Sequence, residues 1–448
     1  MINDTIAAIA TPPGLGGIGI VRLSGPDSEK ILSSVFRAAG NRKMISHQMT
    51  YGHLYSPSGI LDECMAVLMR APRSYTREDV AEIQCHGGVL ICQKALELCL
   101  KQGARLAEPG EFTRRAFENG RIDLSQAEAV MGLINAQSDN SRRFAVQQLQ
   151  GGVSQFIKEA IRELISIEAA IAACTDYPDE VAEEEVTGDL LIRIRKIQNK
   201  LQTACDEHGA HLIRDGLLAV IYGRPNVGKS SLLNALLGEE RAIVTAVPGT
   251  TRDQVNGSFY LDGAPIHLVD TAGIRETDDP VERIGVERSK NAMAKADVIL
   301  AVFDSSQPLT EEDDQCLKEA DDRWVLILNK SDLDQKLSPA DLQARAPELP
   351  LIQLSAALPE TLEPLKNLLR QKASVRDSTL LYQPRHLAAA GRAADELQNA
   401  IRTLQDGYPL DMAAVDLDAA CRSLAEITGD QVDERILDEV FSQFCVGK

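Results

Sequence analysis

The N-terminal part of the chain, residues 1–119, alternates short apolar runs with turns rich in Gly and Pro. Short apolar runs bounded by such turns are typical of strands, whereas a longer run without turn residues favours a helix. The segments 6–10, 20–23 and 82–86 therefore predict strands, and residues 89–102 predict a helix. This pattern as a whole predicts a compact α/β domain.

The pattern becomes helical from Ser125 onward, where apolar positions recur every three to four residues. Ser125 and Glu128 fit a capping box, with Ser125 as the N-cap. The glycine pair at 151–152 is expected to interrupt the helical run. The acidic segment 183–185 is expected to be a solvated loop, followed by a second helix over residues 189–212.

Helical periodicity returns near the end of the chain, over residues 380–444. Two helical stretches that flank an α/β segment predict one helical domain with a second domain inserted into it, because the termini of compact domains often lie close together. The expected division is an N-terminal α/β domain at 1–119, a helical domain in two parts at 120–214 and 374–448, and an inserted α/β domain at 215–373.

The composition is that of a soluble globular protein, with 44% hydrophobic and 25% charged residues. No apolar run approaches the length needed to span a bilayer, and the first residues lack the features of a signal peptide. The nine cysteines show no C-x-x-C spacing, which argues against a zinc site and a disulfide framework. We therefore expect a cytoplasmic protein without membrane contact.

The formal net charge of −19 limits how this chain can bind nucleic acid, because the surface as a whole repels phosphate. Binding would need local basic patches or a basic partner. The candidate patches are Arg114, Arg115, Arg121, Arg142 and Arg143.

The segment Gly223–Ser230 fits G-x-x-x-x-G-K-[ST], the loop that surrounds nucleotide phosphates. An apolar run at 217–222 precedes it as an expected strand, and residues 231–238 follow as an expected helix. Lys229 is then placed to reach the β- and γ-phosphates, and the Ser230 hydroxyl to ligate Mg²⁺. The alternative, a Gly-rich turn without a ligand, lacks support from this context. The segment predicts a nucleoside triphosphate site.

Three further motifs follow in the order of a guanine-nucleotide site. Asp270–Gly273 reads Asp-x-x-Gly, which holds the magnesium shell and contacts the γ-phosphate. Asn329–Asp332 reads Asn-Lys-x-Asp, and its last carboxylate can accept from both N1–H and the 2-amino group of guanine. Ser355–Ala357 would supply a backbone contact to the base. Together these motifs predict a GTPase.

Two features separate the predicted site from Ras-like GTPases. Ile274 stands where Ras-like proteins have the Gln that orients water, so the water must be held from elsewhere. Acidic candidates in the same loop are Glu276, Asp278, Asp279 and Glu282. Asn226, in the middle of the P-loop, would help to bind a monovalent cation in place of an arginine finger; alternatively, it only caps the turn.

A second glycine motif lies near the N-terminus, where Gly14, Gly16 and Gly19 match G-x-G-x-x-G. A dinucleotide site needs a helix after these glycines, and here a β-like run follows. We therefore do not assign a nicotinamide or flavin site. His86, at a strand end, is expected to be a structural hydrogen-bonding residue and not a ligand.

These motifs resemble the tRNA-modification GTPase family MnmE, also called TrmE. The resemblance rests on Gly-x-x-Asn-x-Gly-Lys-Ser, Gly-Thr-Thr-Arg-Asp at 249–253, Asp-Thr-Ala-Gly-Ile at 270–274 and Asn-Lys-Ser-Asp. It extends to residues 10–14, to Pro-Gly-Glu-Phe-Thr at 109–113 and to the terminal Cys-Val-Gly-Lys at 445–448. The resemblance therefore spans the whole chain.

The resemblance implies a K⁺-dependent GTPase with an N-terminal domain that dimerises and binds a tetrahydrofolate derivative in its 5,10-methylene or 5-formyl form. With an FAD-dependent MnmG-type partner, such a homodimer adds a carboxymethylaminomethyl or aminomethyl group to carbon 5 of the wobble uridine of certain tRNAs. GTP hydrolysis would drive dimerisation of the G domains and a change in conformation.

The resemblance also implies roles for particular residues of the G domain. Glu282, Asn226 and Lys229 would act in GTP hydrolysis, and Cys445 would be a functional thiol. The expected GTP contacts are Asn226, Val227, Gly228, Lys229, Ser230, Ser231, Thr245, Ala246, Val247, Pro248, Gly249, Thr250, Thr251, Asp270, Thr271, Ala272, Gly273, Asn329, Lys330, Ser331, Asp332, Ser355, Ala356 and Ala357.

The resemblance also implies which residues bind the two ions and the folate, and which take part in switch movement. K⁺ would be bound by Asn226, Thr245, Val247 and Thr250, and Mg²⁺ by Ser230 and Thr251. The folate pocket would be lined by Arg22, Glu82, Arg121 and Lys448. Switch movement and G-domain dimerisation would involve Arg252, Asp253 and Arg275.

Two other functions compete with this prediction. A GTPase of ribosome assembly would carry a basic RNA-binding domain, but this chain has no KH-like Gly-x-x-Gly and no positively charged flank. A scaffold in which dimerisation is the only output would bind no small molecule at residues 1–120. Neither alternative gives the terminal Cys-x-Gly-Lys a purpose.

Overall fold

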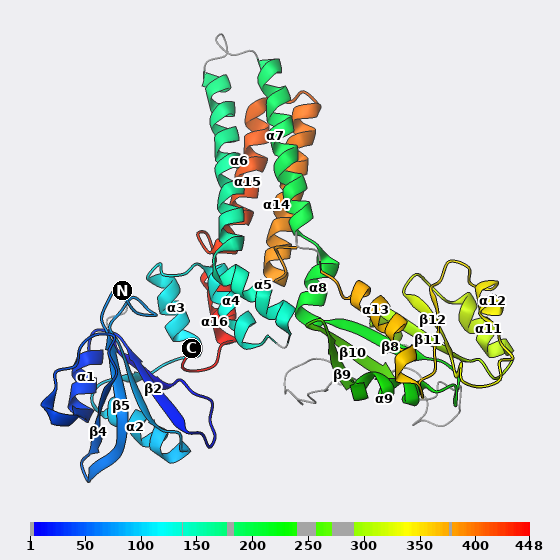
Figure 1. The fold of residues 1–448 in the computed structure, drawn as a ribbon. Helices are drawn as coiled ribbons and strands as arrows, with labels where there is room; N and C mark the ends of the chain where they lie inside the picture. The colour runs from blue at the N-terminus through cyan, green and yellow to red at the C-terminus, as the bar shows by residue number, and fades with distance from the viewer. Residues whose placement is uncertain (1–3, 137, 177–182, 240–256, 271–290, 376–378) are drawn as a thin grey trace, which may run out of the picture. The chain divides into compact units, whose positions relative to one another are not determined.

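The computed structural model describes residues 4–136, 138–176, 183–239, 257–270, 291–375 and 379–448. The chain divides into two compact units (Figure 1). Unit 1 comprises 1–135, 145–199 and 388–448, and unit 2 comprises 136–144 and 200–387. This division keeps the N-terminal domain and most of the helical segments together, so the domain boundaries expected above stay predictions.

Unit 1 begins with a seven-stranded sheet in the order β3-β4-β5-β6-β2-β1-β7. Two helices pack on it, α1 (Ser28–Val35) and α2 (Val89–Lys101), and a third, α3 (Glu111–Glu118), follows the last strand. The predicted strands and the helix at 89–102 are confirmed. The strands are β1 (Ile6–Ile9), β2 (Ile18–Ser24), β3 (Phe36–Ala38), β4 (Thr50–Ser56), β5 (Gly59–Met69), β6 (Val80–His86) and β7 (Arg105–Leu106), with a 3₁₀ turn at Ala39–Asn41.

The structure also agrees with two smaller predictions for this sheet. The segment after Gly14–Gly19 is strand β2 and not a helix, as expected. The His86 imidazole makes a hydrogen bond of 2.7 Å with Asp62, which is a structural contact. Cys92 and Cys99 are both buried on the inner face of α2, and all nine cysteines are free thiols.

The helical part of unit 1 differs from the prediction at two helix starts. The N-cap of α4 (Leu124–Ile134) is Asp123, whose side chain accepts from the Gln126 backbone, so the capping box lies two residues before the predicted one. An Asp side chain caps as well as Ser, and here Ser125 donates to Asp123 instead. The acidic segment at Glu183 is the first turn of α7 (Glu183–Ala204) and not a loop, where negative charge is favoured by the helix dipole.

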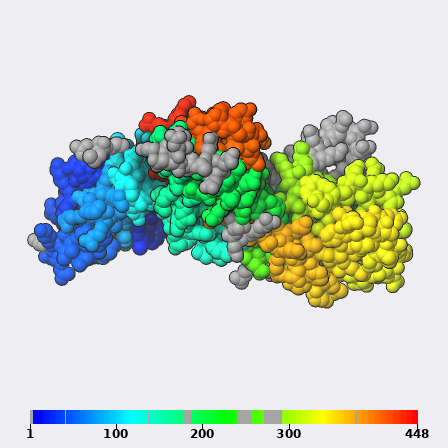
Figure 2. Space-filling view, turned by 90° about the horizontal axis from the view of Figure 1, so that it is seen from above, coloured from blue at the N-terminus to red at the C-terminus, as the bar shows by residue number. Residues whose placement is uncertain are grey.

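Four long helices form the bundle of unit 1. Helix α6 (Gly152–Asp176) packs along α15 (Leu410–Thr428), and α7 is joined to α14 (Pro384–Gln405) by a 3.0 Å bond from Gln198 to Gln398. Figure 2 shows this bundle from its end, with the orange surface of α14 and α15 beside the green surface of α6 and α7. The predicted break at 151–152 is confirmed between α5 (Asp139–Leu149) and α6. Helix α16 (Glu434–Ser442) ends the unit.

Unit 2 contains a six-stranded sheet in the order β13-β12-β11-β8-β10-β9, parallel except for the edge strand β9. Asp262 and Gly263 both have positive φ and join β9 to β10 in a tight hairpin turn. The elements are α8 (Glu207–Asp215), β8 (Leu217–Tyr222), α9 (Lys229–Glu239), β9 (Gly257–Leu261), β10 (Ala264–Asp270), β11 (Val298–Asp304), α11 (Glu311–Lys318), β12 (Trp324–Asn329), α12 (Pro339–Gln343), β13 (Leu351–Gln353), a 3₁₀ turn at Pro359–Thr361 and α13 (Glu363–Lys372).

The predicted second helix at 189–212 is two helices, because α7 ends at Ala204 and α8 is capped separately by Asp206. Helix α8 leads into β8 and carries His211 between two carboxylates. The His211 imidazole contacts Asp215 at 3.0 Å and Asp297 at 3.3 Å. Asp297 also accepts from the Leu218 backbone at the start of β8. These contacts fix the helix to the sheet.

The two carboxylates raise the pKa of His211 to about 9, first through the hydrogen bond with Asp215 and then through that with Asp297. Because the pKa is higher in the folded state, this stabilisation is fully present below about pH 6.5 and is lost as pH rises through 9. We expect the free energy of unfolding to fall by about 2 kcal/mol between pH 7 and 10. His211→Gln should lack this step in urea titrations at several pH values. An equal pH dependence in both proteins would contradict the assignment.

Among the described residues, no helix is both long and apolar enough to cross a membrane.

Candidate functional site

The P-loop connects β8 to α9 at the edge of the sheet where parallel strands end, which is where open α/β sheets bind ligands. The Lys229 side chain is buried and turns back over the loop. Its ammonium donates to the carbonyls of Gly223 at 2.7 Å and Arg224 at 2.9 Å. Burial lowers the pKa of Lys229, and Asp270 partly offsets this effect. The amine therefore lies among the groups that would surround phosphates.

The P-loop is bonded directly to the Asn-Lys-Ser-Asp segment. The Asn329 carboxamide donates to the Val227 carbonyl at 2.9 Å, and the Lys330 ammonium donates to the Asn226 carbonyl at 2.9 Å. A side chain at Gly228 would place its Cβ only 2.2 Å from the Asn329 nitrogen, so this position requires glycine. The phosphate end and the base end of the predicted site therefore form one bonded unit.

The predicted base contacts also lie together. The Ser355 hydroxyl donates to the Asp332 carboxylate, and the Ala356 backbone N–H donates to the side-chain amide oxygen of Asn329 at 3.0 Å. These bonds hold the loop after β13 beside the loop after β12. The Asp332 carboxylate is solvent-exposed, which leaves it accessible to a base with two adjacent N–H donors.

Two buried carboxylates that sequence reasoning missed support this site. Asp304, at the end of β11, accepts a 2.6 Å bond from Lys330. Burial alone would raise the pKa of Asp304, but hydrogen bonds from Lys330 and Ser306 hold it below its ordinary value. The sequence feature that could have indicated Asp304 is the position of an acidic residue directly after the apolar run 298–303.

The second missed carboxylate is Asp313, on α11. Arg224, inside the P-loop, donates to it at 2.9 Å. The same carboxylate accepts from the backbone and hydroxyl of Thr310 in a capping box. The P-loop is thereby attached to the N-terminus of a neighbouring helix. The sequence could have indicated the capping box of Asp313, but it could not have indicated the contact between Asp313 and Arg224.

Two side-chain oxygens that could bind a divalent cation lie next to each other, one on the P-loop helix and one at the end of β10. The Ser230 hydroxyl donates to the Asp270 carboxylate at 3.0 Å. A hydroxyl and a carboxylate suit Mg²⁺, which prefers oxygen ligands. The remaining predicted residues of the G domain lie outside the described residues, namely Thr245, Ala246, Val247, Pro248, Gly249, Thr250, Thr251, Arg252, Asp253, Thr271, Ala272, Gly273, Ile274, Arg275, Glu276, Asp278, Asp279 and Glu282.

The residues predicted to bind folate lie in unit 1. Arg22 on β2 and Glu82 on β6 are direct partners in the antiparallel register, and the guanidinium donates to the carboxylate at 2.8 Å. Arg22 also lies over the ring of Phe112, 5.8 Å from its centre. Arg121 donates to the Tyr75 carbonyl at 2.9 Å and covers the Tyr75 ring. Phe112 and Tyr75 were not predicted.

Residues 445–448 reach this region from the far end of the sequence. Val446 forms an isolated bridge with Pro109, and the Phe112 backbone donates to the Lys448 carbonyl at 3.2 Å. Gly447 has a φ of 94°, and a Cβ there would lie 2.4 Å from the Ile9 carbonyl. This segment is therefore packed directly against β1, next to the strand that carries Arg22. Cys445 is exposed.

Comparisons with known proteins cover the whole chain. Residues 5–121 match the model of the GTP-binding protein TrmE N-terminus, and residues 124–445 match that of the MnmE helical domain. The tRNA modification GTPase MnmE of Enterococcus faecalis is 44% identical over 99% of this chain and 98% of its own. The chain belongs to the MnmE family. The Chloroflexus aurantiacus MnmE is 45% identical over 100% of both chains.

Membership of the MnmE family gives this chain a GTPase role in tRNA modification, with nucleotide and Mg²⁺ binding in general. The expected fold class is confirmed as a multidomain protein with an N-terminal α/β domain, a helical domain and a P-loop G domain. Among solved structures, the G domain of the T. maritima FeoB iron transporter is 29% identical over 35% of this chain and 99% of its own, with a TM-score of 0.28. Aquifex aeolicus Era bound to GDP·AlF₄⁻ is 29% identical over 40% and 66%, with a TM-score of 0.28.

Proposed function

We propose that this MnmE-family chain is a K⁺-dependent GTPase that modifies carbon 5 of the wobble uridine of certain tRNAs. In this proposal a homodimer acts in the cytoplasm with an FAD-dependent MnmG-type partner and adds a carboxymethylaminomethyl or aminomethyl group. The one-carbon donor is a tetrahydrofolate derivative. The proposed domains are 1–119, the helical parts 120–214 and 374–448, and the G domain 215–373.

The observation that carries the proposal is the position of residues 445–448 on the N-terminal domain. Backbone contacts with Pro109 and Phe112 hold this segment, and Arg22 lies over the Phe112 ring. Acidic, basic and thiol groups from distant parts of the chain are thereby gathered in one region. A GTPase that used its flanking segments only as scaffolds would have no need of this arrangement.

The charges in this region fit a folate. The Glu82 carboxylate would accept from the donor edge of a pterin, and Arg22 fixes that carboxylate through their 2.8 Å bond. Arg121 and Lys448 would bind the acidic glutamate tail. The Cys445 thiol, which is exposed, would be the reactive group nearest to the one-carbon unit.

In the G domain, Lys229 would bind the β- and γ-phosphates, while Ser230 and Asp270 would hold Mg²⁺. Asn226 has a φ of 66°, and among the described residues its carboxamide makes no hydrogen bond. A residue that only capped the turn would use that carboxamide to accept a backbone N–H. This observation favours Asn226 as a ligand of K⁺, whose charge would offset the charge that develops on the transferring phosphate.

The proposal predicts that the purified chain and its FAD-dependent partner modify tRNA only when GTP, K⁺, a one-carbon tetrahydrofolate and an amine are all supplied. Ammonium would provide the nitrogen of the aminomethyl group and glycine that of the carboxymethylaminomethyl group, because the folate provides only one carbon. The measurement is mass spectrometry of nucleosides from wobble-uridine tRNAs after reaction. Omitting each component separately is the control. A complete mixture that leaves uridine unmodified, while GTP is hydrolysed, would contradict the tRNA chemistry and favour the ribosome-assembly alternative.

A further inference from the structure

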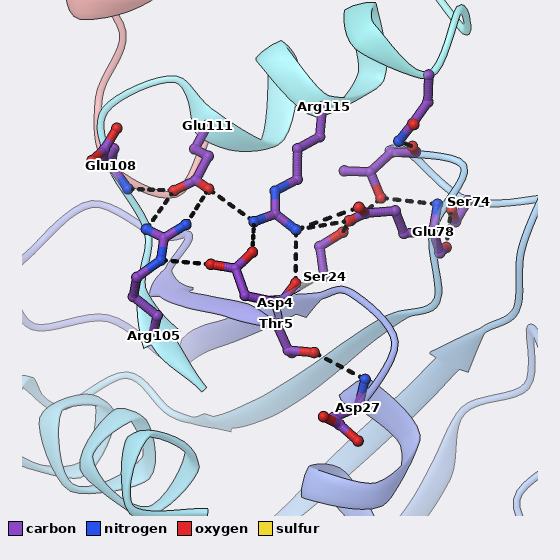
Figure 3. Close-up of polar contacts among 12 residues, drawn as sticks. Asp4, Thr5, Ser24, Asp27, Ser74, Glu78, Arg105, Glu108, Glu111 and Arg115 are labelled. Carbon is purple, nitrogen blue, oxygen red and sulfur yellow. Dashed lines mark hydrogen bonds and ion pairs between the residues drawn. The ribbon is translucent and has the colours of Figure 1, made fainter. Parts of the chain in front are cut away.

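A buried network of charged side chains lies at the base of α3 (Figure 3). At its centre is Arg115, whose side chain is only 2% exposed and ion-paired, so its expected place in a basic surface patch is wrong. Its guanidinium donates to Asp4 at 2.6 Å, to Glu111 at 2.9 Å and to Glu78 at 3.3 Å. The network therefore joins the approach to β1, the loop before β6 and α3.

Glu111 is the second centre of this network and the first residue of α3. Its carboxylate accepts from Arg105 at 2.6 Å and from the backbone of Glu108 at 2.8 Å, as well as from Arg115. Burial alone would raise the pKa of Glu111, but these bonds outweigh burial and lower it. The carboxylate is therefore ionised, and it fixes both the first turn of α3 and the strand before it.

The same turn of α3 contacts Arg22, Lys448 and the tyrosine that carries Arg121, which are three parts of the proposed folate pocket. Phe112 lies against Arg22 and donates its backbone N–H to Lys448. The Thr113 hydroxyl is 3.0 Å from that of Tyr75, on which Arg121 lies. A shift of this turn would move all three contacts together.

The backbone of this turn lies so close to α16 at Gly110 that the turn cannot move toward that helix. Its φ is 69°, and a Cβ there would lie 2.6 Å from the Phe441 carbonyl. The backbone therefore has close neighbours on one side and the charged network on the other. The ion pairs of the network hold this turn together with the buried side chains of Phe112 and Thr113.

We propose that Glu111 and Arg115 are positioning residues that hold residues 445–448 in place at the ligand pocket of the N-terminal domain. This inference rests on the proposed folate function. Neither side chain contacts the ligand. They act through the first turn of α3, because removal of one charge from a buried network leaves its partner uncompensated and forces a rearrangement.

The test is a double-mutant cycle in the full-length chain, with 5-formyltetrahydrofolate as the probe and isothermal titration calorimetry as the readout. One change is Glu111→Gln, and the other is deletion of residues 445–448. We expect each to weaken binding at least tenfold. In the truncated background Glu111→Gln should have no further effect, since the segment it positions is gone.

The matched control is Glu29→Gln in the same domain. Glu29 also forms a two-bond pair with an arginine, Arg70, but its side chain is 44% exposed and lies on α1. We expect Glu29→Gln to bind the probe as the wild type does. If Glu111→Gln fails to fold by circular dichroism, Asp4→Asn replaces it, because Asp4 is 39% exposed and also contacts both arginines.

Additive losses in the cycle, or no loss in Glu111→Gln, would overturn the inference. So would a truncation that leaves binding unchanged. If the wild type itself fails to bind the probe, the proposed folate function fails and the inference fails with it. If the wild type binds the probe but the losses in the cycle are additive, the positioning role of Glu111 is wrong and the proposed folate function stands.

Discussion

Asp332→Asn is expected to lower kcat/KM for GTP by about 10⁴-fold and to make xanthosine triphosphate the better substrate. The carboxylate would accept from two adjacent N–H donors of guanine, and its charge would strengthen both bonds. An amide offers one acceptor and one donor. Xanthine has a carbonyl in place of the 2-amino group, so it matches the amide and not the carboxylate.

The measurement is steady-state phosphate release with each nucleotide. Recovery of activity with xanthosine triphosphate would show that the variant is folded and that only base recognition has changed. Asp334→Asn is the matched control, because it removes an exposed carboxylate from the same loop, two residues away. Equal losses with both nucleotides would mean that Asp332 supports the loop, through its bond with Ser355, and does not read the base.

Asn226→Ala is expected to remove most of the K⁺ stimulation of GTP hydrolysis, a loss of about 10²–10³-fold in K⁺ buffer and little change in Na⁺ buffer. The proposed cation would supply charge that other GTPases obtain from an arginine finger. Because the Asn226 carboxamide is exposed and makes no bond among the described residues, its removal should cost little stability.

Matched K⁺ and Na⁺ buffers of equal ionic strength separate this effect from general salt effects. Asn234→Ala, on the exposed surface of α9, serves as a control of the same chemical change. If the wild type hydrolyses GTP equally fast in both salts, Asn226 is only a turn residue. The enzyme would then need an activating partner.

The nucleotide-binding part of the fold could be predicted because its signals are local in sequence. Each of the segments 217–222, 266–270 and 325–328 is an apolar run followed at once by its motif. A parallel sheet brings such strand ends to one edge, so the site follows from the order of the motifs. The Arg224–Asp313 contact could not be predicted, because the two residues belong to different elements and pair only through the packing of α11.

The charged network could not be predicted for the same reason. Asp4, Glu78, Arg105, Glu111 and Arg115 each read as surface charges in their own segments. They become one cluster around the buried Arg115 and Glu111 because β7 pairs with β1 in parallel and places Arg105 beside Asp4. The helix start at Asp123 was missed by two residues, since Asp123 and Ser125 are both good N-caps and only the backbone decides between them.

The packing of residues 445–448 on β1 has a consequence for synthesis in the cell. The strand that receives this segment leaves the ribosome hundreds of residues earlier, which at about 5–20 residues per second is a delay of tens of seconds. During that interval the first turn of α3 lacks its backbone partner at Lys448. A nascent N-terminal domain would therefore have its sheet before its proposed ligand pocket, and a one-carbon carrier would bind there only after residues 445–448 had been synthesised.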